Sequence, residues 1–204
     1  MKIVKPKIKT LEIGNFSDGD FSNKEFNSID KKIDITNNCF DECIFNNCDF
    51  TKINVNSLDM MDCIFNNCDL SNICLDNQFV TRCQFNDCKL IGTSLVDGNL
   101  KDVEFNNCIS KYINFIGSNI SNLIINNSDF SDSYFSMSDI KKVEFNTVNF
   151  MSSEFLNVNL ENIDFRSCII IKSKFDLKSI KGIIIDSFQC RDIICNFGVI
   201  VKDI

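Results

Sequence analysis

Residues 40–50 have the sequence FDECIFNNCDF and residues 60–70 have the sequence MMDCIFNNCDL, so one pattern returns after twenty residues. Within each run a large apolar residue recurs every five residues, as at Phe40, Phe45 and Phe50. This five-residue step continues without a slip from Ile35 to Ile185, and the recurring residue is apolar at every step except the polar Ser110. We call this large apolar position the centre. Self-similarity at a fixed short period indicates a solenoid and outweighs local propensity.

The position two residues before the centre is small or aliphatic, and the other three positions are mostly polar. A helix would space its apolar residues three and four apart, and a strand would space them two apart. Here the centre and the residue two before it would both point inward, and a turn would follow. Four such five-residue units can close a square coil of about twenty residues, with coils stacked about 4.8 Å apart. Residues twenty apart then stack in columns. One expected column is Phe45, Phe65, Phe85, Phe105, Ile125, Phe145, Phe165 and Ile185.

Blocks such as CDFTK at 48–52, CDLSN at 68–72 and SDFSD at 128–132 carry a resemblance to a known family. They resemble the pentapeptide-repeat proteins, with Cys or Ser often in place of the family's Ala. The resemblance implies an all-β fold, a right-handed quadrilateral parallel β-helix. The repeat by itself does not specify an activity.

We divide the chain into three parts. Residues 1–34 form a lead-in and an irregular first coil, with a strand-like stretch at 8–13 and inward Phe16, Phe21 and Phe26. Residues 35–185 form the regular β-helix. Two of its blocks are irregular: Gln78 and Ser110 occupy inward positions, and Phe79 and Ile109 point outward.

Residues 186–204 form a C-terminal cap, because a solenoid must cover its last coil. Asp186 and Gln189 resemble a capping box, and Gly198 is placed to end the helix. The apolar spacing of the helix predicts an amphipathic element, followed by a short strand at 199–201. Leftover apolar surface favours a homodimer joined end to end through the C-terminus. The predicted dimer seam consists of Cys190, Ile193, Ile194 and Phe197.

The tail also resembles the C-terminal end of the Qnr group of pentapeptide-repeat proteins, which bind type II topoisomerases and protect them from quinolones. The shared features are an aromatic-Gln pair, Phe188-Gln189, and a Phe197-Gly198 pair before an aliphatic run. No projecting loop interrupts the coils after Ile35, so the chain looks more like the loop-free MfpA type and the Gram-positive Qnr-like proteins. The resemblance implies a partner, DNA gyrase or topoisomerase IV, and a DNA-mimicking mode of binding. The alternative is a structural scaffold or interaction module without topoisomerase affinity.

Composition narrows the classes of function. The 204 residues carry a net charge of −7, which argues against direct binding of nucleic acid, and they include no His, which excludes a His base or a Ser-His triad. No nucleotide-binding motif is present, so we expect neither an enzyme nor a cofactor. Eight of the twelve Cys occupy inward positions, where we expect reduced thiols that fill volume, and a metal array is the weaker alternative. With no signal peptide and no transmembrane stretch, we expect a cytoplasmic protein.

One corner of the predicted coil carries carboxylates in register. These residues lie two after one centre or one before the next, and we call them the acidic seam: Glu42, Asp62, Asp102, Glu104, Glu144 and Asp164. Arg82 and Lys142 interrupt the line. A solvated edge is the ordinary explanation for such charges. The sharper hypothesis is that this line faces basic residues of a topoisomerase.

Overall fold

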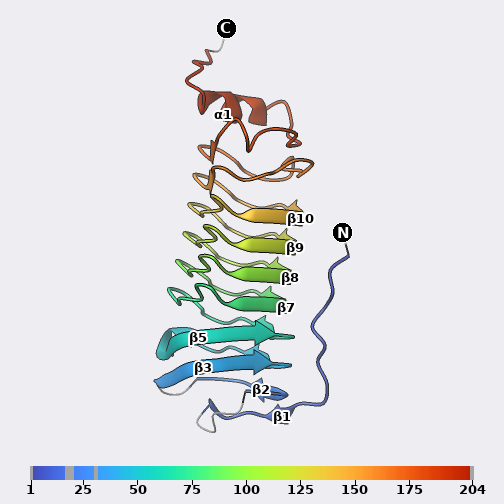
Figure 1. Cartoon of the computed structure of the whole chain (residues 1–204), viewed down its shortest axis with the longest axis vertical. Coiled ribbons are helices and arrows are strands. Elements are labelled where there is room, and N and C mark those ends of the chain that lie inside the picture. Colours follow the sequence, from blue (N-terminus) through green and yellow to red (C-terminus); the bar gives the residue numbers. More distant parts are fainter. Residues whose placement is uncertain (1, 17–20, 30–31, 203–204) are drawn as a thin grey trace.

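A computed structural model describes residues 2–16, 21–29 and 32–202 and shows a stack of parallel coils along one axis (Figure 1). Its elements, all β-strands unless marked, are β1 (Glu12–Ile13), β2 (Lys24–Phe26), β3 (Ile33–Asp41), β4 (Ile44–Asn46), the 3-10 turn η2 (Phe50–Lys52), β5 (Ile53–Met61), β6 (Ile64–Asn66), β7 (Phe79–Asn86), β8 (Asn99–Asn106), β9 (Asn119–Asn126), β10 (Asp139–Asn146), β11 (Glu154–Phe155), β12 (Lys174–Phe175) and the helix α1 (Gln189–Cys195). The predicted right-handed quadrilateral parallel β-helix with a C-terminal capping helix is confirmed.

The strands pair in the register that the sequence predicts. Between β7 and β8, Phe85 pairs with Phe105, and between β8 and β9, Phe105 pairs with Ile125, so partners lie twenty residues apart. Phe26 instead pairs with Phe45, nineteen residues away. The step of nine residues between Phe26 and Ile35 explains this difference, because it removes one residue from the first full coil.

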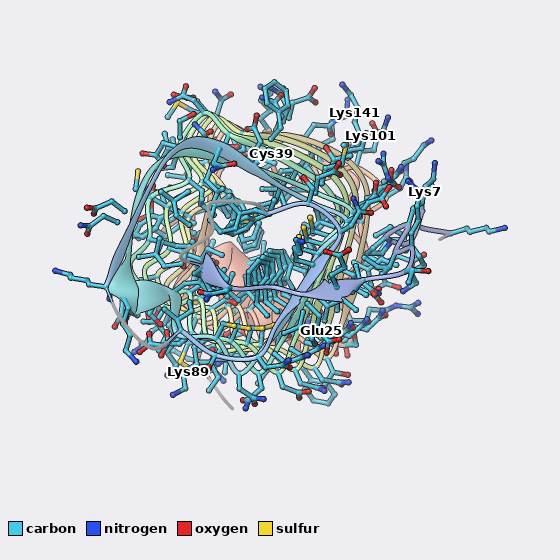
Figure 2. The ribbon with its side chains drawn as sticks, turned by 90° about the horizontal axis from the view of Figure 1, so that it is seen from below. Lys7, Glu25, Cys39, Lys89, Lys101 and Lys141 are labelled. Atoms are coloured by element: carbon cyan, nitrogen blue, oxygen red, sulfur yellow. The ribbon has the colours of Figure 1, made fainter. Side chains whose placement is uncertain are left out.

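The core is a set of stacked columns inside the coils (Figure 2). The rings of Phe45, Phe65 and Phe85 stack with centroids 4.8 Å apart and planes within 11° of parallel, which measures the rise of one coil. Phe16, Phe21 and Phe26 are buried below this column, so their predicted inward placement is confirmed. The eight inward Cys are also buried, and each donates its S–H to a backbone carbonyl 22 or 23 residues earlier, as Cys88 does to Phe65.

The corners explain why the outward positions are polar. Backbone φ is positive at the residue two after almost every centre, for example 53° at Asn47, 53° at Asp62 and 54° at Asn107. This left-handed conformation costs most L-residues about 1–2 kcal/mol, and Gly, Asn and Asp adopt it most readily. Tyr112 and Met137 adopt it too, because the coil fixes the backbone there. The five-residue period therefore combines an inward pair with an obligatory corner.

The cap begins with the predicted capping box. Asp186 Oδ1 accepts from the backbone N–H of Gln189 at 2.9 Å, and Gln189 Oε1 accepts in return from the N–H of Asp186 at 3.0 Å. Gly198 follows the helix with φ of 76°, as predicted. The predicted strand at 199–201 is wrong, because these residues form no strand and Ile200 is 81% exposed. With no further coil beside it, this segment has no strand edge to pair with.

The N-terminal lead-in differs most from its prediction. Of the strand-like stretch at 8–13, only Glu12 and Ile13 form a strand, and residues 2–11 have no regular secondary structure. Residues 30 and 31, between β2 and β3, lie outside the described residues. Within the described part of the chain, no helix is long and apolar enough to cross a membrane.

Candidate functional site

The acidic seam exists as one corner of the coil, but a segment of the same chain lies on its lower part. Residues 3–9, which we call the N-terminal strap, run alongside the solenoid from the end that carries β1 toward the coil of β9 (Figure 1). Lys7 lies on this segment outside the ring of coils, on the side from which Lys101 and Lys141 also project (Figure 2).

Four contacts join the strap to four seam carboxylates. Lys9 Nζ donates to Glu42 Oε1 at 2.7 Å, and the backbone N–H of Lys7 donates to Asp62 Oδ1 at 2.9 Å. Two coils further along, Lys5 Nζ forms an ion pair with Glu104, and the backbone N–H of Val4 donates to Asp102 Oδ1 at 3.1 Å. The strap therefore meets the seam alternately with ammonium groups and with backbone amides.

Side chains on neighbouring coils also donate to the seam carboxylates. Arg82 donates to both oxygens of Asp62, from Nε at 2.7 Å and from Nη2 at 2.5 Å. Asn122 donates to Asp102 at 3.0 Å, and Gln84 donates to Glu104 at 2.6 Å. Arg82 was expected to interrupt the seam, and instead it is the bidentate partner of Asp62.

The lower seam is consequently buried. Asp62, Asp102 and Glu104 are only 3%, 4% and 8% exposed, so the expectation of an open line of charge is wrong for these three residues. Burial raises the pKa of the Asp62 carboxyl, but hydrogen bonds from Arg82 and from the Lys7 backbone outweigh burial and leave that pKa lowered. At Glu104 the same balance holds, because donation by Lys5 and Gln84 outweighs burial and lowers the pKa.

At the lower end of the seam, hydrogen-bond donors do not match all of the carboxylate oxygens. Glu42 Oε2 and Asp41 Oδ1 are buried and have no hydrogen-bond partner among the described residues. Burial and then repulsion from Glu42 and Asp62 raise the pKa of Asp41, with Lys9 and Arg82 offsetting only part of the effect. This end therefore holds more negative charge than the strap neutralises.

The upper seam lies beyond the strap. Glu144 and Asp164 line an open hollow with Asn162 and Arg166. Arg166 Nη2 donates to Asp164 Oδ2 at 2.7 Å, which lowers the pKa of that carboxyl. The seam thus has a lower part under the strap and an upper part open to solvent.

The predicted dimer seam also has a buried part and an exposed part. Ile193 is 6% exposed and packs into the core below α1, whereas Ile194 and Phe197 are 38% and 39% exposed, and Cys190 is exposed. Ile193 is therefore part of the cap and not of an outward surface. In the described residues, no group of three or more His, Cys, Asp or Glu is arranged to hold a metal ion.

Sequence reasoning missed the strap and the ladder of amides beside the seam. Each of Asn66, Asn86, Asn106, Asn126 and Asn146 donates from Nδ2 to the Asn Oδ1 one coil below, at 2.8–2.9 Å. The ladder could have been found, because Asn recurs every twenty residues. The strap could not have been placed, although the alternation of Lys5, Lys7 and Lys9 with apolar residues indicates an extended segment.

These features define a repeat solenoid with a charged, partly covered corner. Residues 58–135 match the pentapeptide repeat region and residues 128–167 match pentapeptide repeats, together more than half of the chain. The protein belongs to the pentapeptide-repeat family, whose solenoids are typically non-enzymatic interaction modules.

Solved structures of other pentapeptide-repeat proteins are similar at low identity. A trypsin-treated form of QnrB1, a plasmid-mediated fluoroquinolone resistance protein, is 14% identical over 87% of this chain and 99% of that chain, with a TM-score of 0.38. HetL of Nostoc sp. strain PCC 7120, involved in heterocyst differentiation regulation, is 12% identical over 80% of this chain and 91% of its own, with a TM-score of 0.28. No curated protein sequence matches the chain.

Proposed function

We propose that this protein is a non-catalytic binding protein that acts on type II topoisomerases, DNA gyrase or topoisomerase IV, by imitating duplex DNA. Its effect would be to compete with DNA and to alter the action of quinolones. Support comes from the resemblance of the C-terminal tail to the Qnr group, from the net charge of −7 and from the rod of stacked coils.

The observation that carries the proposal is the register of the seam. Stacked rings set a coil rise of 4.8 Å, so seam carboxylates on one column recur at multiples of this spacing along a stiff rod. Duplex DNA presents one charge per 1.7 Å of its axis, counting both strands. Asp102 and Glu104 place two carboxylates on one coil, or one charge per about 2.4 Å there, so this part of the seam approaches the charge spacing of DNA where partner cations replace those of the strap.

The test is a supercoiling assay with purified gyrase, with and without a quinolone. The full chain is compared with the triple variant Asp102→Lys, Glu104→Lys, Glu144→Lys. The matched control is Asp87→Lys, Asp97→Lys, Asp132→Lys, which makes the same change in net charge at corners with φ of 54° to 57°. Lys is accepted at such corners, as Lys142 and Lys172 show.

We expect the wild type and the control variant to inhibit supercoiling, and the seam variant to lose at least tenfold in potency. Exposed ion pairs are individually weak and screened by salt, so the assay is run at low salt and single changes should have small effects. Equal potency of the seam and control variants would remove the seam from the mechanism. A wild type without any effect on supercoiling would refute the topoisomerase proposal.

A scaffold role is the second candidate. An exposed apolar column would favour it. Val96, Ile116 and Leu156 form a column at the residue after the centre, but they are half-buried and Ser136 within the column is buried. Other apolar side chains face outward. Ile109, Met151, Ile169 and Ile171 are 39–47% exposed on the face that follows the asparagine ladder. If co-purification from a bacterial lysate recovers a partner that Ile171→Glu releases and seam changes do not, this second function is favoured.

A further inference from the structure

The strap shows how the lower seam binds a peptide. An extended segment is held by backbone N–H groups at Val4 and Lys7 and by ammonium groups at Lys5 and Lys9, all directed at carboxylates. Two of the four contacts use the backbone, so they depend on extended conformation and not on side-chain identity. This is a mode of peptide recognition in which main-chain hydrogen bonds give affinity and side chains give specificity.

The spacing of the strap matches the spacing of the coils. Val4 and Lys7 are three residues apart, which is about 10 Å in an extended chain at about 3.3 Å per residue. Their acceptors, Asp102 and Asp62, lie two coils apart, and one coil rise is 4.8 Å in the aromatic column. Three extended residues therefore span two coils, so a peptide can lie along the axis in register with the carboxylates.

The seam also contains apolar positions. Ile124 stands one residue before a centre, on the outer face, yet it is only 9% exposed, and Ile3 of the strap is 8% exposed. Ile124 pairs with Glu104, the partner of Lys5, on the coil below. The upper end of the covered groove thus places a buried apolar side chain next to the carboxylate that Lys5 contacts.

Several features make the strap a weakly held occupant. It has no regular secondary structure, and its pairing side chains are largely in solvent, 58% exposed at Lys5 and 74% at Lys9. Ion pairs of this kind contribute little each and are screened by salt. At the lower end, Glu42 Oε2 and Asp41 Oδ1 have no donor among the residues that the structure describes, so each can accept from a further donor.

We propose that the lower seam, lined by Glu42, Asp62, Asp102 and Glu104, is a binding groove for an extended lysine-rich segment of a partner protein. The strap occupies this groove in cis and must leave before the partner binds. The partner segment has alternating basic residues, an apolar residue beyond its N-terminal Lys and a further cation at its C-terminal end. The inference goes beyond the proposed function, because it requires no topoisomerase.

The test uses the full chain and a fluorescent peptide with the sequence of residues 2–11, KIVKPKIKTL. Binding is measured by fluorescence anisotropy at low salt, for the wild type and for the variant Lys5→Glu, Lys9→Glu. A tethered strap competes at an effective concentration on the order of mM, and the variant places like charges against Glu104 and Glu42. We therefore expect the variant to bind the peptide at least tenfold more tightly than the wild type, and high salt to abolish binding.

Two further variants locate the groove. Adding Asp62→Asn, Asp102→Asn and Glu104→Gln to the strap variant should abolish peptide binding, whereas adding Asp87→Asn, Asp97→Asn and Asp132→Asn should leave it within about twofold. A peptide in which all four Lys are replaced by Glu should not bind either chain. Equal binding of the peptide to wild type and strap variant, or binding that ignores the seam changes, would overturn the proposal.

If the strap variant fails to fold, a measurement on the wild type still tests whether the peptide displaces the strap. Hydrogen exchange at the amides of Val4 and Lys7 should be at least fivefold faster with excess peptide than without it; an unchanged rate would refute displacement. If light scattering instead shows a dimer that Lys5→Glu, Lys9→Glu dissociates, the strap serves a second copy and the cis assignment is wrong. Loss of the supercoiling effect with peptide binding intact would refute the proposed function alone.

Discussion

Each thiol of the Cys columns lies between coils, where it fills volume and donates to a carbonyl. Burial raises the pKa of Cys108 to about 12 and that of Cys63 well above its usual range. Hydrogen bonds with neighbouring thiols lower the pKa of Cys68 and Cys43, but both side chains are buried like the others. We expect all eight inward thiols to be unreactive in the folded chain, because a reagent or a metal needs an accessible thiolate. At pH 8, a thiol reagent should label only the exposed Cys74, Cys190 and Cys195 quickly, and all twelve after denaturation.

Native mass spectrometry of the same sample provides the control. A stoichiometric metal, or rapid labelling of the inward thiols in the folded chain, would contradict the assignment of these residues to packing. Unfolding should also be insensitive to chelators, since no fold stability would come from metal binding.

Asp41 and Asp62 lie on neighbouring coils and should respond to amidation in opposite ways. The pKa of Asp41 is raised by burial and by repulsion, so its ionised form destabilises the fold above the ordinary pKa of about 3.9. Asp41→Asn should therefore stabilise the protein at pH 7, by less than about 1 kcal/mol for a partly exposed charge, and the gain should vanish below about pH 4.

The pKa of Asp62 is lowered by Arg82 and Lys7 in spite of burial, so its ionised form stabilises the fold above about pH 4 and this contribution is lost in acid. Asp62→Asn should cost about 1–3 kcal/mol at pH 7 and much less at pH 3. Urea unfolding at both pH values measures the two effects, and changes of the same sign at pH 7 would contradict the electrostatic account.

Among the elements, the cap shows what a local pattern can specify. Gln189 completes the capping box with Asp186 and also donates from Nε2 to the carbonyls of Phe165 and Cys168, both at 2.8 Å. Asp186→Ala should cost about 0.5–2 kcal/mol as the loss of a cap. Gln189→Ala should cost more, because it removes the donor of the buried Cys168 carbonyl and one of the two donors of the Phe165 carbonyl, which keeps the Cys168 N–H. Equal midpoints of the two variants in urea would show that α1 is held by its apolar face alone.

The strap shows where local pattern fails. The columns, the corners and the capping box could all be predicted, because each depends on residues within five positions or on a strict twenty-residue register. The strap binds residues 33 to 99 positions away, and nothing within residues 3–9 states which of four corners it follows. The six seam residues were therefore found in the sequence, but the burial of Asp62, Asp102 and Glu104 depends on a contact that carries no periodic signal.

At the scale of the whole molecule, the C-terminal end of the rod exposes apolar side chains. Phe188, directly before α1, and Ile200, after it, are 87% and 81% exposed, and Ile194 and Phe197 are partly exposed. A C-terminal end of this kind can pair with its copy about a twofold axis. The homodimer remains a prediction, and its surface is narrower than the sequence indicates, because Ile193 faces the core.

Phe197→Asp tests this dimer, since it places a charge on the exposed side of the cap without touching Ile193. We expect light scattering to give a dimer for the wild type and a monomer for the variant, with β-rich circular dichroism unchanged. Phe79→Asp is the matched control, because Phe79 is 55% exposed on β7, in the middle of the rod, and the change should leave the dimer intact. Ile193→Asp should instead dislodge the cap and cost about 3 kcal/mol or more. A wild type that is monomeric at micromolar concentration would end the dimer hypothesis, and dissociation by Phe79→Asp would place the interface along the rod.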